Sequence, residues 1–281
     1  MIKKVSVVAG VLFLIGIIGM ALTYKFRPET SEENLHEIID REGFKQIHVK
    51  SDNARIIMIP TTDTTPSIEL SGHKKNDKLT TDIKGDALYI NLKNTNILQI
   101  NFDLFPRRLT LKVFVPEEAY ESMHVSTENG SIEINDMEVA DLLLLTENGH
   151  IKLDNIQGQK IKAVTDNGDL KFKGIHAEAV DLETDNGRIN LDDVTGAITG
   201  RTDNGAILLK TVDLERPLDL ETDNGRIEIE TENEPKNVVL DLKTDLGRIK
   251  VFEDTNWDTV IGSGEHLIKL KTDNGGITIR K

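Results

Sequence analysis

The sequence has no cysteine and very few aromatic residues: 8 Phe, 3 Tyr and 1 Trp in 281 residues. Without cysteine the chain forms no disulfide, no thiolate zinc site and no thiol nucleophile. Its 34 Lys and Arg residues are outnumbered by 48 Asp and Glu residues, which gives a formal net charge of −14. This charge argues against nucleic-acid binding, which needs clustered cations. Val, Ile and Leu are nevertheless frequent enough to build a thin core without large rings.

Residues 5–24 form an uncharged, mostly apolar run of the length that crosses a bilayer as a helix. Basic residues flank it on both sides: Lys3, Lys4, Lys25 and Arg27. Positive flanks on both sides do not orient the segment. We interpret it as a transmembrane signal anchor, with residues 1–4 in the cytoplasm and the body outside. The alternatives are a cleaved signal peptide, because Gly19-Met20-Ala21 resembles a cleavage site, and a buried helix.

Residues 25–43 are interpreted as a linker that ends in a short capping helix. Thr30 and Glu33 have the spacing of a capping box, and Gly43 is a typical helix stop. Apolar residues between them recur at helical spacing: Leu35, Ile38 and Ile39. We expect this helix to cover the open end of the first repeat.

From residue 44 onward a four-residue unit, Thr-(Asp/Glu)-Asn-Gly, recurs through the sequence. Seven intact copies start at Thr127, Thr146, Thr165, Thr184, Thr202, Thr222 and Thr272. An eighth copy, Thr244-Asp245-Leu246-Gly247, has lost its Asn, and Ser51-Asp52-Asn53-Ala54 is a degenerate ninth copy. The first glycines of the series are 19 residues apart. Such a fixed period indicates a repeat architecture.

Each unit is followed by alternating residues, as in Arg188-Ile189-Asn190-Leu191, which predict strands with one buried face. Asn-Gly tolerates positive φ, so we expect it to turn the chain sharply. Two all-β architectures fit. In a hairpin-built sandwich, the strands on either side of Asn186-Gly187 would pair with each other. In a β-solenoid, each coil of about 19 residues stacks on the next. The constant period and the few aromatics favour the solenoid.

The order of these features resembles the bacterial putative-adhesin family of β-strand-repeat cell-envelope proteins. It comprises an N-terminal anchor, early degenerate strands, the strand Leu-Lys-Val-Phe-Val-Pro-Glu-Glu at 111–118, and then the Thr-Asp-Asn-Gly-x-Ile repeats. The resemblance covers residues 44–281. It implies a right-handed β-solenoid and a place in the cell envelope, often of Gram-positive bacteria, and some members are linked to envelope stress. It supplies no catalytic residue.

Stacked coils would align the turn acids Asp166, Asp185, Asp203 and Asp223 about 4.8 Å apart. Hydrogen bonds to turn amides, nearby Arg188 and Arg226, or a cation such as calcium would relieve their repulsion. We interpret these acids as turn residues and predict no metal site.

The longest departure from the repeat surrounds Trp257, and it is our candidate for an irregular binding patch. Gly262-Ser263-Gly264 with His266 lacks the full Gly-x-Ser-x-Gly elbow of a nucleophile. We therefore predict no catalytic residue, no cofactor and no metal.

The predicted organisation is a cytoplasmic N-terminus (1–4), a signal anchor (5–24), a linker with a capping helix (25–43) and an adhesin domain (44–281). We expect a single-pass, externally displayed solenoid that binds a cell-wall polymer or a membrane protein and does not bind nucleic acid. An envelope-stress sensor is the alternative. A β-helical polysaccharide-degrading enzyme is less favoured, because its acids would lie at irregular positions in one cleft.

Overall fold

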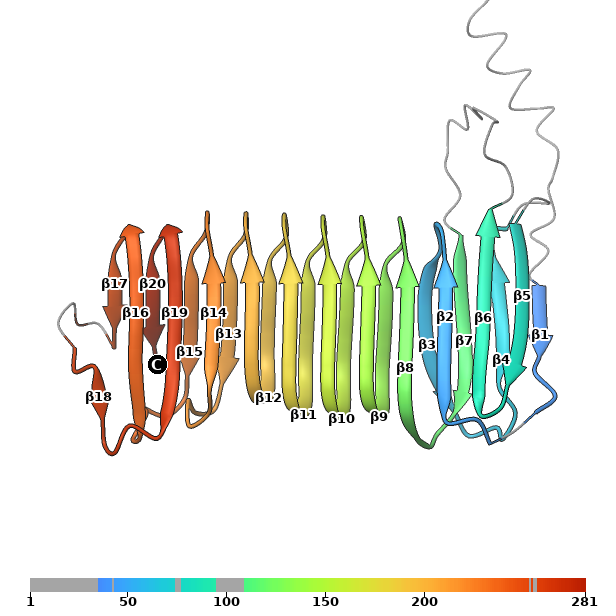
Figure 1. The fold of residues 1–281 in the computed structure, drawn as a ribbon, viewed down its shortest axis with the longest axis horizontal. Helices are drawn as coiled ribbons and strands as arrows, with labels where there is room; N and C mark the ends of the chain where they lie inside the picture. The colour runs from blue at the N-terminus through green and yellow to red at the C-terminus, as the bar shows by residue number, and fades with distance from the viewer. Residues whose placement is uncertain (1–34, 42, 74–76, 95–108, 253, 255–256) are drawn as a thin grey trace, which may run out of the picture. The chain divides into compact units, whose positions relative to one another are not determined.

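The computed structural model describes residues 35–41, 43–73, 77–94, 109–252, 254 and 257–281. Within these residues the chain forms twenty strands and no helix (Figure 1). No helix suited to crossing a bilayer therefore occurs in the described part of the chain. The predicted anchor at 5–24 and the predicted cytoplasmic residues 1–4 lie outside the described residues.

The strands of the N-terminal part are β1 (Leu35–Ile38), β2 (Gln46–Ser51), β3 (Arg55–Thr61), β4 (Ser67–Ser71), β5 (Asp77–Lys84), β6 (Ala87–Asn94) and β7 (Thr110–Pro116). The middle contains β8 (Ala119–Thr127), β9 (Ile132–Thr146), β10 (Ile151–Thr165), β11 (Leu170–Thr184), β12 (Ile189–Thr202), β13 (Ile207–Thr211), β14 (Leu218–Thr222) and β15 (Ile227–Thr231). The C-terminal part contains β16 (Val238–Leu246), β17 (Ile249–Val251), β18 (Val260–Ile261), β19 (His266–Asn274) and β20 (Ile277–Arg280).

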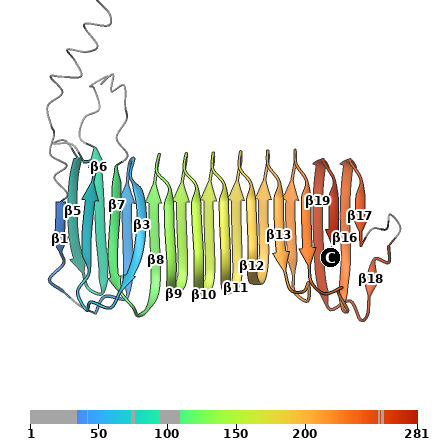
Figure 2. The same cartoon turned by 180° about the vertical axis from the view of Figure 1, so that it is seen from behind.

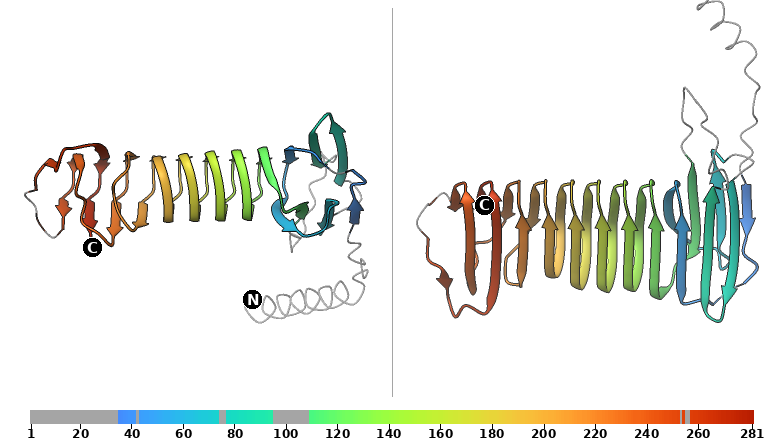
Figure 3. Two further views of the ribbon diagram at one scale, coloured as in Figure 1. Left: turned by 90° about the horizontal axis from the view of Figure 1, so that it is seen from below. Right: turned by 45° about the horizontal axis from the view of Figure 1, so that its top comes forward.

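The middle strands stack as successive coils of a β-solenoid, as the views in Figure 3 show. β10 and β11 pair in parallel with a shift of one repeat, so that Ile151 lies opposite Leu170. β11 and β12 pair in the same way. The strands that flank Asn186-Gly187 therefore pair with neighbouring coils and not with each other. This confirms the solenoid prediction, and the hairpin alternative is wrong.

The strands form two rows. The first row runs through β5, β6, β2, β8, β9, β10, β11, β12, β14, β19 and β16. The second row runs through β1, β4, β7, β3, β9, β10, β11, β12, β13, β15, β20 and β17. β9 to β12 are long enough to belong to both rows. Ile189 and Leu191 are buried and Arg188 is exposed, as their alternation predicts.

The Thr, Asn and Gly residues of the Thr-x-Asn-Gly turn contact the coil before it. The Thr184 hydroxyl is buried and donates to the carbonyl of Gly168 at 3.0 Å. The Asn186 side-chain amide donates to the Asn167 side-chain carbonyl at 2.9 Å. Seven such amide bonds of 2.8–3.0 Å occur within the described residues, and they link Asn53, Asn129, Asn148, Asn167, Asn186, Asn204, Asn224 and Asn274 into one ladder.

The turn glycines are required for close approach and not for their φ angles. A Cβ on Gly187 would lie 1.8 Å from the carbonyl oxygen of Gly168, far inside contact distance. None of the eight turn glycines, all of which are described, has a positive φ. The expectation that Asn-Gly supplies a left-handed turn is therefore wrong. Glycine is needed at this position because stacking of the coils brings the backbones of successive turns too close for a side chain.

Left-handed residues lie instead at the bend halfway along the long strands. Asp136, Asn155 and Asp193 have φ angles of 54–56°, and Gly174 has a φ of 61°. Asp and Asn tolerate this conformation better than most residues. The chain of each coil changes direction at this bend as well as at the Thr-x-Asn-Gly turn. The residue type at the bend varies between coils, so the sequence repeat did not reveal it.

Sequence order and spatial order differ at both ends of the solenoid (Figure 2). At the N-terminal end, the coil made by β2 and β3 lies between β6–β7 and β8–β9. At the C-terminal end, β19 and β20 lie between β14–β15 and the terminal coil β16–β17. At the C-terminal end the chain thus runs outward to β16–β17 and returns to fill the gap that it left, whereas at the N-terminal end β2 and β3 precede the strands on both sides of them.

The predicted capping helix is not formed in the described residues. Leu35–Ile38 is the strand β1, which pairs antiparallel with β4. The Ile39 amide donates to the carbonyl of Pro66 at 2.9 Å. The edge of β4 offers unpaired backbone groups, and pairing with them overrides the weak helical preference of a short segment. The proposed capping-box residues Thr30 and Glu33 lie outside the described residues.

Candidate functional site

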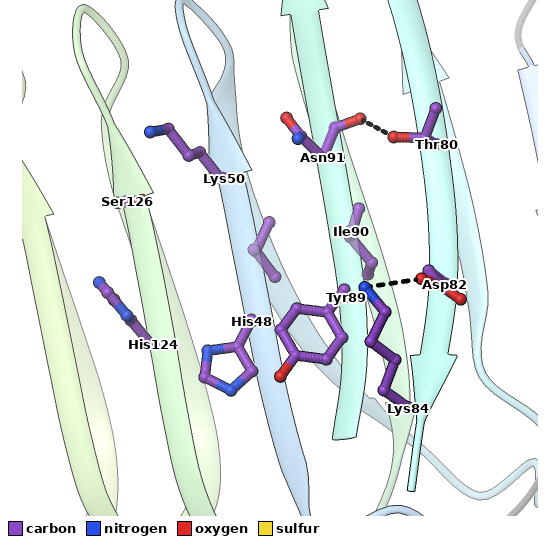
Figure 4. Close-up of a pocket in the computed structure, with 11 residues that line it drawn as sticks. His48, Lys50, Thr80, Asp82, Lys84, Tyr89, Ile90, Asn91, His124 and Ser126 are labelled. Carbon is purple, nitrogen blue, oxygen red and sulfur yellow. Dashed lines mark hydrogen bonds and ion pairs between the residues drawn. The ribbon is translucent and has the colours of Figure 1, made fainter. Parts of the chain in front are cut away.

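A hollow of about 410 Å³ interrupts the outer surface of the first row near its N-terminal end (Figure 4). We call it the imidazole–tyrosine pocket. Its volume is within the range of small-molecule sites. The side chains that define it are His48 and Lys50 on β2, Asp82 and Lys84 on β5, Tyr89 and Asn91 on β6, and His124 on β8.

Strand alternation places the rings of the pocket on one outward-facing line. His48 pairs with Tyr89 on one side and with His124 on the other. Asp82 is the partner of Tyr89 on the next strand. The neighbours of each ring in sequence, such as Ile47 and Val49 beside His48, point into the core and are buried. The core pattern therefore fixes the outward direction of the three rings.

The rings of His48 and Tyr89 are stacked with nearly parallel planes, and we call this ring pair the platform. Their centroids are 4.7 Å apart and their planes differ by only 6°. His124 lies edge-on beside them, with its ring centroid 6.0 Å from that of His48. Lys84 places its Nζ 5.4 Å from the centre of the Tyr89 ring and 3.1 Å from the Asp82 carboxylate. Tyr89 still has 36% of its surface exposed, so the platform is open to a ligand.

Two polar atoms of the pocket are buried without a hydrogen-bond partner in the described part of the chain. They are Oδ1 of Asn91 and Nε2 of His124. Leaving such an atom unsatisfied costs about 1–3 kcal/mol. A water molecule, or a hydroxyl group of a ligand, would supply the hydrogen bond that each of these atoms lacks.

The pKa of His124 is lowered from its ordinary value of 6.5, mainly because the ring is partly buried. The nearby His48 and Lys50 lower this pKa further. His124 is therefore neutral at pH 7, and one of its ring nitrogens accepts a hydrogen bond while the other donates.

The stretch around Trp257 differs from the predicted binding patch. Trp257 is half-buried and packs against the core together with Phe252 and Ile261. β18, which includes Ile261, pairs with the outer edge of β16 at the terminal coil. The described part of this stretch therefore covers the end of the solenoid.

The Ser263 and His266 pair is not arranged for catalysis. The Ser263 hydroxyl bonds to the side chain of Asn237, and the His266 amide donates to the Asn237 carbonyl at 3.2 Å. Gly262 and Gly264 have positive φ on either side of Ser263. Asn237 thus organises a tight return turn.

The turn acids stack as the repeat predicts. The amide of Asn186 donates to the carbonyl of Asp166, and that of Asn204 to the carbonyl of Asp185. The carboxylates are exposed, which weakens their mutual repulsion. Arg226 pairs with Glu228 at 3.3 Å, and the Arg188 amide bonds to the side chain of Asp169. In the described ranges, no group of three acidic or imidazole side chains is placed to hold a metal ion.

Sequence reasoning missed the pocket, although each ring carries a local signal. His48, Tyr89 and His124 each stand between two apolar residues, at positions that alternation directs outward. Their assembly depends on β2 lying between β6 and β8, which no local pattern reveals.

A sequence model of the Toastrack DUF4097 family matches residues 44–280. No functionally curated protein matches the chain. The fold is similar to that of a putative adhesin from Bacteroides fragilis, with a TM-score of 0.56 and 14% identity over 89% of this chain and 98% of the other. A putative lipid binding protein from Parabacteroides distasonis matches over 90% and 98% of the two chains at 15% identity, with a TM-score of 0.40.

Proposed function

The chain belongs to the Toastrack DUF4097 family, and from that premise we propose that it is a non-enzymatic binding and scaffold protein of the bacterial cell envelope. The observation that carries this proposal is the imidazole–tyrosine pocket, an open ring platform on an otherwise repetitive rod. Asn53, which follows β2, belongs to the Asn ladder, and β6, which carries Tyr89, pairs in parallel with β2 from Ala87 to Leu92. A rigid support of this kind limits the ordering cost of binding. The similar fold from Bacteroides fragilis is named a putative adhesin.

The proposed location is the cell membrane, with residues 5–24 as a single-pass anchor and the solenoid on the outer side. The partner is a cell-wall polymer, and the acidic surface does not suit nucleic acid. In intact cells, added protease should digest the solenoid of the full chain without lysis. Protection until lysis would contradict the outward orientation.

Binding is tested by sedimenting isolated cell walls with the full-length protein in detergent. We expect the wild type to sediment and a His48→Ala, Tyr89→Ala double variant to stay in solution. His176→Ala is the matched control, because His176 is an exposed imidazole on β11 outside the pocket. Equal sedimentation of all three proteins would overturn the role of the pocket. Crosslinking to one defined membrane protein, with no wall binding, would favour the envelope-stress sensor instead.

A further inference from the structure

We propose that the imidazole–tyrosine pocket binds an acidic carbohydrate, with a sugar ring on the platform of Tyr89 and His48 and its carboxylate beside Lys50. This inference rests on the proposed binding function and specifies its ligand class. It draws on the charge, the shape and the unsatisfied polar atoms of the pocket.

The charge of the pocket is opposite to that of the chain. The chain carries −14, whereas the side chains that line the pocket include two lysines and one aspartate. Lys84 is paired with Asp82. Lys50 is exposed and forms no ion pair within the described residues. A cation without a partner on an acidic rod attracts an anion to this place, since the surrounding acids repel it elsewhere.

The platform favours a ligand that contains a sugar ring. His48 and Tyr89 are stacked with nearly parallel planes and centroids 4.7 Å apart, and the parts of the rings that the stack leaves uncovered present an amphipathic surface with polar edges. The C–H face of a sugar ring fits such a surface. Because Tyr89 keeps part of its surface exposed, a single sugar ring can rest there while the rest of the polymer continues along the rod.

The two polar atoms without a partner favour a ligand with hydroxyl groups over an anion that has no proton to donate. Asn91 Oδ1 accepts hydrogen bonds only, so phosphate or sulfate without a proton cannot satisfy it. Nε2 of His124 lacks a partner in the same pocket. A sugar hydroxyl both donates and accepts, and Ser126 adds a further hydroxyl to the lining. An acidic sugar combines these hydroxyls with the negative charge that Lys50 attracts.

The experiment titrates the full-length protein in detergent with galacturonate oligomers, with galactose oligomers of equal length, and with inorganic phosphate. We expect the galacturonate oligomer to bind at least tenfold more tightly than the galactose oligomer, and phosphate to bind more weakly than either. Lys50→Glu should weaken galacturonate binding at least tenfold and leave galactose binding unchanged. Tyr89→Ala should weaken both oligomers.

Lys173→Glu is the matched control, because Lys173 is an exposed lysine of β11 outside the pocket. It should change galacturonate binding less than twofold. Equal effects of Lys50→Glu and Lys173→Glu, or equal affinity for charged and neutral oligomers, would overturn the ligand class. If wall sedimentation still required His48 and Tyr89 in that case, the proposed function would stand and only the acidic sugar would be wrong. Unchanged circular dichroism spectra exclude misfolding as the cause.

Discussion

The coils in the middle of the solenoid and those at its two ends are connected differently. In the middle, coils adjacent in space are adjacent in sequence, and Asn ladder bonds join residues 18–20 positions apart. At the ends the same ladder bond spans 76 positions between Asn129 and Asn53, and 50 positions between Asn274 and Asn224. In the middle, the ladder bonds thus join coils that follow each other in sequence. At the ends, they join coils that are distant in sequence.

This difference shows how the protein protects its terminal coils. In a simple solenoid the last coil contacts one neighbour and frays first. Here the last strands in sequence, β19 and β20, are held between two coils. The terminal coil β16–β17 is in turn tied to the chain at both of its ends. It still lacks a full neighbour outside, and Leu246 remains 72% exposed.

The largest expected effect comes from adding a methyl group to a turn glycine. Gly187→Ala should lower the free energy of unfolding by about 3 kcal/mol or more, because the neighbouring coils cannot move apart. Gly247→Ala meets the Gly275 carbonyl at 1.7 Å, but its coil is terminal and can shift outward, so we expect about half that loss. Urea unfolding followed by circular dichroism measures both variants. Equal losses would show that the ends are as constrained as the middle.

A smaller effect is expected from the buried threonines. Thr184→Val removes the hydroxyl bond to Gly168 and should cost about 1–2 kcal/mol. Thr244→Val removes the equivalent bond to Gly275 in the terminal coil, where the side chain is half-buried. Water can replace part of that bond, so the loss should be about 0.5 kcal/mol. The same unfolding assay applies, and a larger loss for Thr244→Val would contradict the comparison.

Extending the Asn ladder should stabilise the terminal coil slightly. Leu246 lies opposite Asn274, where the next side-chain amide would stand. Leu246→Asn adds one hydrogen bond and removes an exposed apolar side chain, so we expect a gain of about 0.5 kcal/mol. Leu267→Asn is the control, because Leu267 is also exposed but lies outside the ladder. A gain in both variants would attribute the effect to solubility rather than to the ladder.

The smallest expected effect is a weakening of the N-terminal end on mild acidification. The folded pKa of His124 lies below 6.5, so the unfolded state binds the proton first. Stability is complete above pH 6.5 and falls as the pH drops toward the folded pKa. The titratable groups that act on His124 are His48 and Lys50 on β2. Hydrogen exchange in β8 should therefore accelerate more than in β11 between pH 7.5 and 5.5, after correction for intrinsic rates. His124→Gln should remove this difference.

The repeat could be predicted because each coil carries its own signals. The 19-residue period and the alternation around Ile189 indicated parallel coils, and the structure confirms them. The role of glycine could not be inferred from one turn alone, because the clash at Gly187 involves the carbonyl of another coil. Leu35–Ile38 reads as a helix locally, but the free edge of β4 makes it a strand.

The pocket could not be predicted because its residues come together only through the return of the chain. His48 and His124 are far apart in sequence, and they become neighbours because β8 passes β6 and pairs with β2. The local patterns gave the outward direction of each ring but not its partners. The stretch around Trp257 is irregular in sequence for a different reason, since it must cover an end where the repeat stops.

The return of the chain at the C-terminal end also affects how the rod can change length. Because β20 lies between β15 and β17, a repeat appended after it would meet a coil already in place. New units can enter in the middle, where each insertion of 19 residues adds one spacing of about 4.8 Å. An inserted repeat would therefore move the pocket away from the terminal coil by that same step.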